Sequence, residues 1–367
     1  MIKLAYLDRQ HKSIHSKLLD NYKKTLTNNS FILGGDVSNF EILFSKYCNA
    51  KYAAGVGNGL DALRLSLMAL GVGEDDEVIV PSNSFIATAT AVSLVNAKPI
   101  FVDCTDNYRI NIEHAKQLIT RRTKAIIPVH LFGMPENMIE IIKFSKVYNL
   151  LIIEDCSQAH GAKFMGRSVG TFGEFGTFSF YPTKNLGAQG DGGAVISNNK
   201  QNIEKIKILR NYGSNKKNNY KFVGLNSRLD SLQAGILSTK LKFLDKWNKD
   251  RWAIAQIYLN ELSGIKNFLL PEIDSRNVEC VWHLFVVRCK DGNRNKLIEF
   301  LKGKKIMVGI HYPVPIHKAK IYKYRSQAVL RNSEKISKEI LSLPMDPFLK
   351  KEEAFKVVNA IKEFYSL

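Results

Sequence analysis

The strongest constraint on the fold of this chain is an alternation of short apolar runs with helical patterns over residues 50–200. Seven runs have the composition of buried strands: Tyr52–Val56, Val78–Val80, Ile100–Asp103, Ala125–Val129, Leu151–Glu154, Thr177–Tyr181 and Ala194–Ser197. Strands that alternate with helices form mostly parallel sheets whose two faces are both covered. The alternation therefore predicts an α/β fold around a mostly parallel sheet.

Helical periodicity is clearest in two of the intervening segments. In the first, leucines recur at three- and four-residue steps before a terminating Gly71, at Leu60, Leu63, Leu67 and Leu70. In the second, the same period links Ile139, Ile142, Lys143 and Lys146. We expect one helix in each segment, with the polar side of the second facing solvent.

The pattern changes after about residue 230. An amphipathic stretch, Leu229–Leu262, predicts one or two connecting helices. A β-type run at Val281–Cys289 then opens a second α/β segment, which the helical pattern of Lys351–Phe364 closes. We expect a large domain over residues 1–240, including the N-terminal segment, and a smaller C-terminal α/β domain over 241–367.

The formal net charge of +19 comes from 53 Lys and Arg against 34 Asp and Glu. Such a charge can attract nucleic acid, acidic membranes or anionic small molecules. The basic residues are spread along the chain, without a basic tail or a basic stripe interleaved with aromatics. This spread favours solubility and attraction for phosphate-bearing substrates over nucleic-acid binding.

Cysteine usage and hydropathy indicate a cytoplasmic protein. The 5 cysteines are odd in number and include no C-x-x-C pair, which argues against a disulfide framework and against a zinc ribbon, so we expect no metal. The N-terminus lacks the apolar core of a secretion signal. No window approaches the ~20 apolar residues of a membrane helix, so we expect no membrane partner.

Two motifs could form parts of a ligand site. The glycines of Gly55–Gly59 lie between a predicted strand and a predicted helix, where backbone N–H groups can approach a phosphate. They do not match the dinucleotide fingerprint, and a tight turn would also explain them.

The buried run Leu151–Asp155 ends in two acids at the sheet edge where α/β folds bind ligands. A structural acid or a helix cap is the alternative there.

A third motif places a lysine after an apolar strand. In Thr177–Asn185 the strand leads into a turn with Lys184, and the glycine-rich Gly187–Gly193 follows. Alone, Lys184 could be a solvated surface lysine. Near a ligand its pKa can fall, and the amine can become a Schiff-base nucleophile. A phosphate cradle, a strand-end carboxylate and such a lysine together match the needs of pyridoxal phosphate.

These motifs resemble those of the DegT-type nucleotide-sugar aminotransferases, which have the aspartate-aminotransferase fold (fold type I). The resemblance extends along nearly the whole chain and is strongest at Gly57–Leu63, Pro81–Thr88, Glu154–Gly161, Ser179–Gly187 and Asn226–Asp230. It implies a large domain that binds pyridoxal 5'-phosphate around a seven-stranded sheet. It also implies a homodimer whose two active sites are shared between the subunits.

The resemblance also implies residue roles. Lys184 would form the internal aldimine and shuttle a proton, and Asp155 would keep the cofactor's ring nitrogen protonated. The other cofactor-binding residues would be Gly57, Asn58, Phe85, Gln158 and Ser179, with Asn226 acting from the partner subunit. The substrate-binding residues would be Tyr181, Tyr220, His311 and Tyr312. Arg228 is a candidate for the donor carboxylate, with an interface or structural role equally open, and His160 is expected to be structural.

The implied reaction is a ping-pong transfer from L-glutamate, through pyridoxamine phosphate, to a dTDP-linked keto sugar. Relatives that aminate C3 of a dTDP-3-keto-6-deoxyhexose tend to carry the loops found here at Gly57–Leu63 and Tyr181–Gly187. We therefore expect a dTDP-3-amino-3,6-dideoxyhexose, for a surface polysaccharide such as O-antigen lipopolysaccharide or for a secondary metabolite. A C4 aminotransferase of the same family, a DNA-binding regulator and a catalytically silent scaffold remain alternatives.

Overall fold

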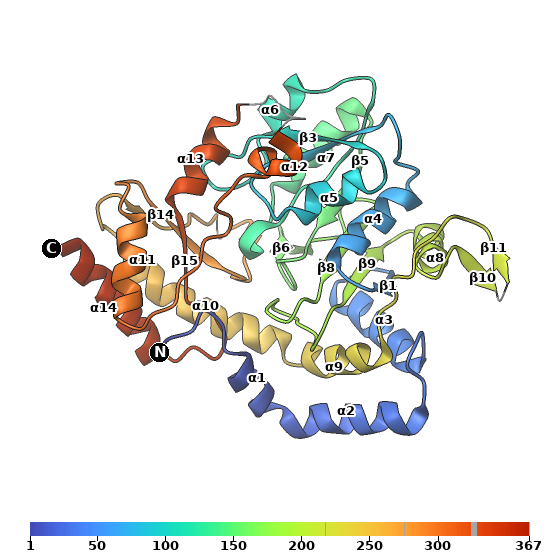
Figure 1. Ribbon diagram of the computed structural model, residues 1–367, viewed down its shortest axis with the longest axis horizontal. Coiled ribbons are helices and arrows are strands. Elements are labelled where there is room, and N and C mark those ends of the chain that lie inside the picture. Colours follow the sequence, from blue (N-terminus) through green and yellow to red (C-terminus); the bar gives the residue numbers. More distant parts are fainter. Residues whose placement is uncertain (217, 275, 324–328, 367) are drawn as a thin grey trace.

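The computed structural model describes residues 1–367 except 217, 275, 324–328 and 367. Its centre is a seven-stranded sheet in the order β1-β9-β8-β5-β4-β2-β3 (Figure 1). The strands are β1 (Tyr52–Val56), β2 (Glu77–Pro81), β3 (Lys98–Val102), β4 (Thr123–Ile126), β5 (Leu151–Asp155), β8 (Phe175–Ser179) and β9 (Gly193–Ser197). Strand β9 is antiparallel to both neighbours, whereas the remaining pairs are parallel. The predicted α/β fold with a mostly parallel sheet is confirmed.

Helices cover both faces of this sheet. One face shares an apolar cluster with α4 (Gly59–Ala69), α5 (Ala87–Ser93) and α8 (Lys200–Leu209). The other face packs against α3 (Gly35–Tyr47) and α9 (Ser231–Leu241) at one end, and against α6 (Ile112–Gln117) and α7 (Met138–Tyr148) at the other. Because both faces are buried, strands such as β1 and β9 are largely apolar runs without alternation.

The two periodic segments are helices, but the buried side of the second was predicted wrongly. In α4, Leu63 and Leu67 are fully buried, and the helix ends before Gly71, which has a φ of +69°. In α7 the buried side is formed by Met138, Ile141 and Phe144, whereas Ile139 is 58% exposed. Both stripes satisfy the helical period, and the bulkier one faces the sheet.

The C-terminal part forms a second, smaller α/β unit. Its antiparallel sheet, in the order β12-β14-β15, contains β12 (Phe268–Leu269), β14 (Phe285–Cys289) and β15 (Ile340–Leu343). One apolar cluster joins this sheet to α10 (Leu244–Glu261), α11 (Arg294–Gly303) and α14 (Lys351–Ser366). The stretch Leu229–Leu262 is thus two helices, α9 and α10. The predicted strand Val281–Cys289 begins only at Phe285, because Trp282 has a left-handed φ of +46°.

Short elements complete the described chain. They are α1 (Leu7–Ser13), α2 (His15–Asn28), η1 (Leu131–Gly133), β6 (Lys163–Phe164), β7 (Arg167–Ser168), β10 (Ser214–Lys216), β11 (Asn219–Tyr220), β13 (Val278–Glu279), η2 (Ile316–Lys318), α12 (Lys320–Lys323) and α13 (Arg331–Glu339). At the N-terminus, Ile2 and Tyr6 pack in the apolar cluster of the C-terminal unit, and Ile2 N donates to Lys305 O at 2.8 Å. The domain limits 1–240 and 241–367 stay a prediction, with α9 ending at Leu241.

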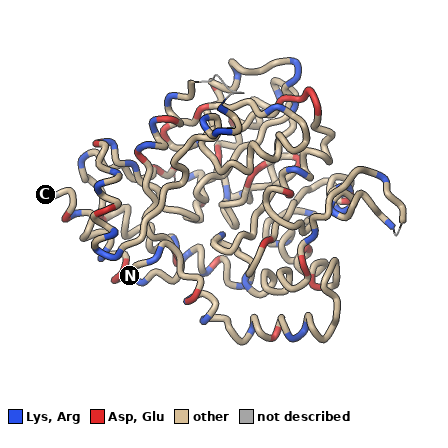
Figure 2. Tube along the Cα trace, viewed as in Figure 1, with Lys and Arg blue, Asp and Glu red and all other residues tan. Residues whose placement is uncertain are grey.

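Charge is distributed over the whole described trace. Figure 2 shows Lys and Arg on nearly every part of the molecule, with Asp and Glu between them. Within the described ranges, every helix is too short or too polar to cross a lipid bilayer.

Candidate active site

Lys184 lies in a tight turn directly after β8. Its backbone N–H donates to Tyr181 O at 2.8 Å, and a Cβ on Gly187 would lie 2.2 Å from Pro182 O, so the turn needs glycine there. The side chain is partly buried. Desolvation lowers the pKa of Lys184 from 10.5 to about 8, against the opposing charge of Asp155. In the described part of the chain, its ammonium group has no hydrogen-bond or ion-pair partner.

Asp155 ends β5, the parallel neighbour of β8, and its carboxylate is buried. Oδ2 accepts a hydrogen bond from Thr88 Oγ1 and Oδ1 accepts one from Ser157 N, each at 3.1 Å. Thr88 belongs to α5, so the carboxylate is held from the helix layer as well as from the sheet. A buried carboxylate with only neutral donors is suited to a cationic ligand.

A hydrogen-bond network fixes the strand end next to Asp155. His130, Glu154 and Cys156 bring three possible metal ligands within 4.8 Å of one another. The Glu154 carboxylate, however, lies 3.1 Å from His130 Nε2 and accepts from the backbone N–H groups of Gly170, Phe172 and Gly173. His130 Nδ1 accepts from Glu136 N at 3.0 Å, so His130 Nε2 is the donor to Glu154. These groups serve the backbone rather than a metal ion.

The N-terminus of α4 forms a polar cradle beside Ser179. Asn58 caps the helix, with its Oδ1 accepting from Asp61 N at 2.8 Å. Gly57 N donates to Ser227 Oγ at 3.0 Å. A Cβ on Gly59 would lie 2.6 Å from Ser179 Cβ, so only glycine allows this close approach. Helix N-termini of this kind bind anions, phosphates in particular.

The opposite wall carries an amide and two aromatic rings. Gln158 Oε1 accepts from Phe132 N at 2.7 Å, and its Nε2 donates to Tyr312 OH at 3.1 Å. The Tyr312 ring lies 5.5 Å from the Phe85 ring, which is 52% exposed. Desolvation raises the pKa of Tyr312 to about 12, so its hydroxyl stays protonated. His311 Nδ1 lies 2.8 Å from Ser342 Oγ.

Most of the predicted site residues line one cavity of about 480 Å³. They are Asn58, Phe85, Asp155, Gln158, Ser179, Tyr181, Lys184, His311 and Tyr312. Gly57 does not line the cavity, and its N–H donates to Ser227 Oγ. Tyr220 and Asn226 do not line this cavity; both are exposed, and Tyr220 belongs to the β10–β11 hairpin that projects from the molecule (Figure 1).

Known proteins share this fold and these motifs. The sequence pattern of the DegT/DnrJ/EryC1/StrS aminotransferase family matches residues 12–362 of this chain. The chain belongs to this family. A relative from Aneurinibacillus thermoaerophilus, named dTDP-3-amino-3,6-dideoxy-alpha-D-galactopyranose transaminase, is 47% identical over 93% of each chain.

Solved structures of similar proteins agree with the fold of this aminotransferase. The crystal structure of Streptomyces venezuelae DesV in complex with a ketimine intermediate is 37% identical, covers 100% of this chain and 99% of its own, and has a TM-score of 0.97. NtdA of Bacillus subtilis with bound cofactor PMP is 29% identical over 97% of this chain and 82% of its own, with a TM-score of 0.91.

Two further predicted residues of the aminotransferase lie outside the cavity. Arg228 Nη1 donates to Asn211 Oδ1 at 3.0 Å, and its guanidinium carbon lies 5.4 Å from the centre of the Tyr212 ring. His160 is fully buried between the rings of Phe178 and Phe180. Burial, with help from the Lys184 charge, lowers the pKa of His160 to about 3, so its imidazole is neutral.

Among the cavity residues that the sequence did not single out, Thr88 and His283 bear most on its chemistry. Thr88 ends the motif Pro81–Thr88, but its hydrogen bond to Asp155 depends on where the fold places α5 relative to the end of β5. His283 lies in the run Val281–Cys289, where it is a polar residue among apolar ones. This polar residue within an apolar run could have indicated a site residue, but we interpreted the whole run as a strand.

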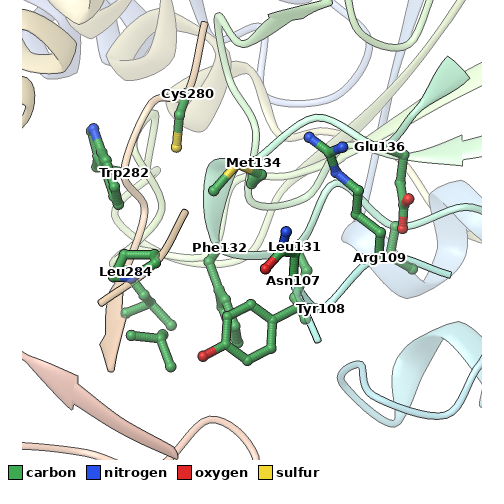
Figure 3. Close-up of a pocket in the computed structure, with 13 residues that line it drawn as sticks. Asn107, Tyr108, Arg109, Leu131, Phe132, Met134, Glu136, Cys280, Trp282 and Leu284 are labelled. Atoms are coloured by element: carbon green, nitrogen blue, oxygen red, sulfur yellow. The ribbon is translucent and has the colours of Figure 1, made fainter. Parts of the chain in front are cut away.

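A second cavity lies behind the same wall. It measures about 20 Å³, room for about one water molecule. Phe132, Trp282 and Leu284 face it together with Arg109 and Glu136 (Figure 3). None of the predicted site residues lines it. A sugar nucleotide needs a far larger volume, so we assign the chemistry to the cavity with Lys184.

Proposed function

We propose that the protein is a pyridoxal-phosphate-dependent aminotransferase that moves an amino group from L-glutamate to C3 of a dTDP-3-keto-6-deoxyhexose. One observation carries this proposal: the free amine of Lys184 and the buried carboxylate of Asp155 share a cavity with the N-terminus of α4. The 47% identity to a named dTDP-3-amino sugar transaminase supports the choice of substrate class.

The residues present fit pyridoxal phosphate. Lys184 would hold the cofactor covalently. Asp155 would face the protonated ring nitrogen of the cofactor, which would be the cationic partner that this carboxylate otherwise lacks. Gly57, Asn58 and Ser179 would bind the phosphate, while Phe85 and Gln158 would contact the ring. When bound, the cofactor supplies an electron sink for a carbanion at the amino-bearing carbon.

Lys184 is also suited to move the proton of the amino-bearing carbon. An amine with a pKa of about 8 is partly neutral at physiological pH, so its Nζ can take up a proton and return it. Tyr312 keeps its proton and orients Gln158 rather than acting as a base. Arg228 donates to Asn211 and does not line the cavity, so we do not assign it to the donor carboxylate.

The sugar nucleotide would lie against both subunits of a homodimer. Tyr181, His311 and Tyr312 line the cavity and would contact the diphosphate from one subunit. Tyr220 and Asn226 are exposed and away from the cavity of their own chain, which supports a role in the site of the partner subunit. The site would therefore be complete only in the dimer.

The product would be made in the cytoplasm. The 5 cysteines are free thiols, as expected in a reducing compartment. A dTDP-3-amino-3,6-dideoxyhexose would supply a surface polysaccharide, such as O-antigen lipopolysaccharide, or a secondary metabolite.

An assay with L-glutamate and either dTDP-3-keto- or dTDP-4-keto-6-deoxyhexose tests the proposal. We expect the 3-keto sugar to be consumed, with NMR placing the new amine at C3. An amine at C4 would instead identify the C4 aminotransferase of the same family. Absence of transamination together with duplex DNA binding that weakens steeply with salt would favour a regulator.

A further inference from the structure

His283 lines the cavity of Lys184 from the C-terminal part of the chain. Of its neighbours, Trp282 lines only the small second cavity, whereas Leu284 lies between the two cavities and lines both (Figure 3). His283 itself lines the larger cavity and not the smaller one. Only 8% of His283 is exposed, so the ring is part of the cavity wall and not of the outer surface.

Three backbone contacts hold the segment that presents His283. Val281 N donates to Gly133 O at 3.0 Å, and Leu284 N donates to Phe132 O at 3.3 Å. The buried Arg251 donates from Nη1 to Trp282 O at 3.3 Å. A Cβ on Gly133 would lie 2.9 Å from His283 N, so the two segments approach as closely as glycine allows. The position of the imidazole is therefore fixed from several elements.

Asn185, the residue after Lys184, fixes the tautomer of this imidazole. Asn185 Nδ2 donates to Val281 O at 2.8 Å, and this carbonyl can only accept, which sets the orientation of the amide. Asn185 Oδ1 therefore faces His283 Nδ1, at 3.1 Å. An oxygen acceptor requires a proton on Nδ1, so in the neutral ring Nε2 carries the lone pair.

The ring is neutral under physiological conditions. Burial, together with the nearby charge of Lys184, lowers the pKa of His283 well below 6.5. Its Nε2 has no hydrogen-bond partner in the described part of the chain. The cavity thus contains one neutral, fixed hydrogen-bond acceptor that the proposed cofactor and diphosphate contacts do not use.

We propose that Nε2 of His283 accepts a hydrogen bond from a hydroxyl of the hexose, so that His283 is a specificity-determining residue for the sugar ring. This inference rests on the proposed function. Of the proposed ligands, the carboxylates of L-glutamate and the diphosphate would be repelled by a lone pair, whereas a sugar hydroxyl is a neutral donor of the right kind. Asn185 is then a positioning residue, because it acts through His283.

Two substitutions separate this role from a structural one. His283→Asn keeps a donor that can reach Asn185 but removes the acceptor in the cavity. His283→Gln is longer and can place an amide oxygen near the position of Nε2. The probes are dTDP-glucose, which has hydroxyls on the ring, and dTDP alone, which lacks the hexose. Calorimetry on the full-length protein gives the Kd of each.

We expect His283→Asn to weaken dTDP-glucose binding about tenfold and to leave the Kd of dTDP unchanged, as for the loss of one neutral hydrogen bond. His283→Gln should recover most of this loss. The absorbance change that L-glutamate causes in the holoenzyme should proceed at the wild-type rate in both variants.

Four results would overturn the inference. Equal weakening of dTDP and dTDP-glucose would mean a structural role. A slower reaction with L-glutamate, with unchanged dTDP-glucose binding, would mean that His283 acts on Lys184 instead. Unchanged binding in both variants, with a normal L-glutamate response, would contradict this inference but leave the proposed function intact. A wild-type protein with neither dTDP binding nor an L-glutamate response would overturn the proposed function, and this inference with it.

Discussion

At the residue scale, the ammonium group of Lys184 lies in a cavity where it makes no hydrogen bond within the described chain. Desolvation lowers the pKa of Lys184 to about 8, and the charge of Asp155 opposes this shift. A neutral amine is required for attack on an aldehyde. The environment thus prepares Lys184 for reaction near physiological pH, whereas an ordinary lysine would stay protonated.

This shift predicts how the apoprotein takes up pyridoxal phosphate as pH changes. Below about 8 the uptake rate should rise about tenfold per pH unit, because the neutral fraction does, and it should level off above that pH. The growth of visible absorbance measures the rate, with N-acetyl-lysine as the unperturbed reference amine. If the uptake rate kept rising up to the pH at which N-acetyl-lysine loses its side-chain proton, the pKa of Lys184 would not be lowered.

Thr88 gives a second prediction at this scale. Thr88→Val removes the hydroxyl that donates to Asp155 and should weaken pyridoxal-phosphate binding about tenfold, since one charge-assisted hydrogen bond is lost. Thr90→Val in the same helix is the matched control, because Thr90 Oγ1 donates only to Ile86 O, at 3.0 Å. Fluorescence titration of each apoprotein measures the affinity. Equal affinities in the two variants would argue against a role of Thr88 in holding Asp155.

At the element scale, the start of α4 depends on a close approach to β8. Gly59→Ala should destabilise the protein by about 1–3 kcal/mol, because its Cβ would lie 2.6 Å from Ser179 Cβ. Gly35→Ala is a matched control: Gly35 also begins a helix, α3, but a Cβ there meets nothing within 4 Å. Urea unfolding gives both changes in stability. A Gly59→Ala protein as stable as Gly35→Ala would show that the cradle tolerates a side chain.

Prediction from the sequence worked best for elements that are buried on both sides. The strands of the central sheet are continuous apolar runs, so β1, β5 and β9 were located to within a residue or two. The prediction of the buried side of α7 was wrong, because this helix carries two apolar stripes. The late start of β14 could not be predicted, since it depends on Trp282 and on contacts with Gly133, which is distant in the sequence. The position of His283 was missed for the same reason.

At the scale of the whole molecule, the cavity is lined both by residues at the end of the central sheet and by residues of the C-terminal part. Asp155 ends β5 and Lys184 lies in the turn after β8, whereas His283, His311 and Tyr312 come from the C-terminal half. The short motifs predicted Asp155 and Lys184, because strand ends carry sequence signals of their own. The family resemblance added His311 and Tyr312, whereas His283 was missed. Tyr220 and Asn226 remain predictions, since their proposed role lies in another subunit.

Mixing two inactive variants tests the shared site. Lys184→Ala and Asn226→Ala should each have low activity as homodimers. After unfolding and refolding together at equal amounts, about a quarter of the wild-type activity should return, because half of the dimers then contain one intact site of two. Each variant refolded alone is the control. If Asn226 acted within its own chain, no mixed dimer would have an intact site and no activity would return.

The central claim is that Lys184 holds pyridoxal phosphate covalently. Its most direct test is borohydride reduction of the purified holoprotein, followed by mass spectrometry of its peptides. We predict that the visible absorption band disappears on reduction and that the pyridoxyl group is found on the peptide with Lys184, while Lys184→Ala carries no reducible band. A pyridoxyl group on another lysine, or full transaminase activity in Lys184→Ala, would contradict the claim.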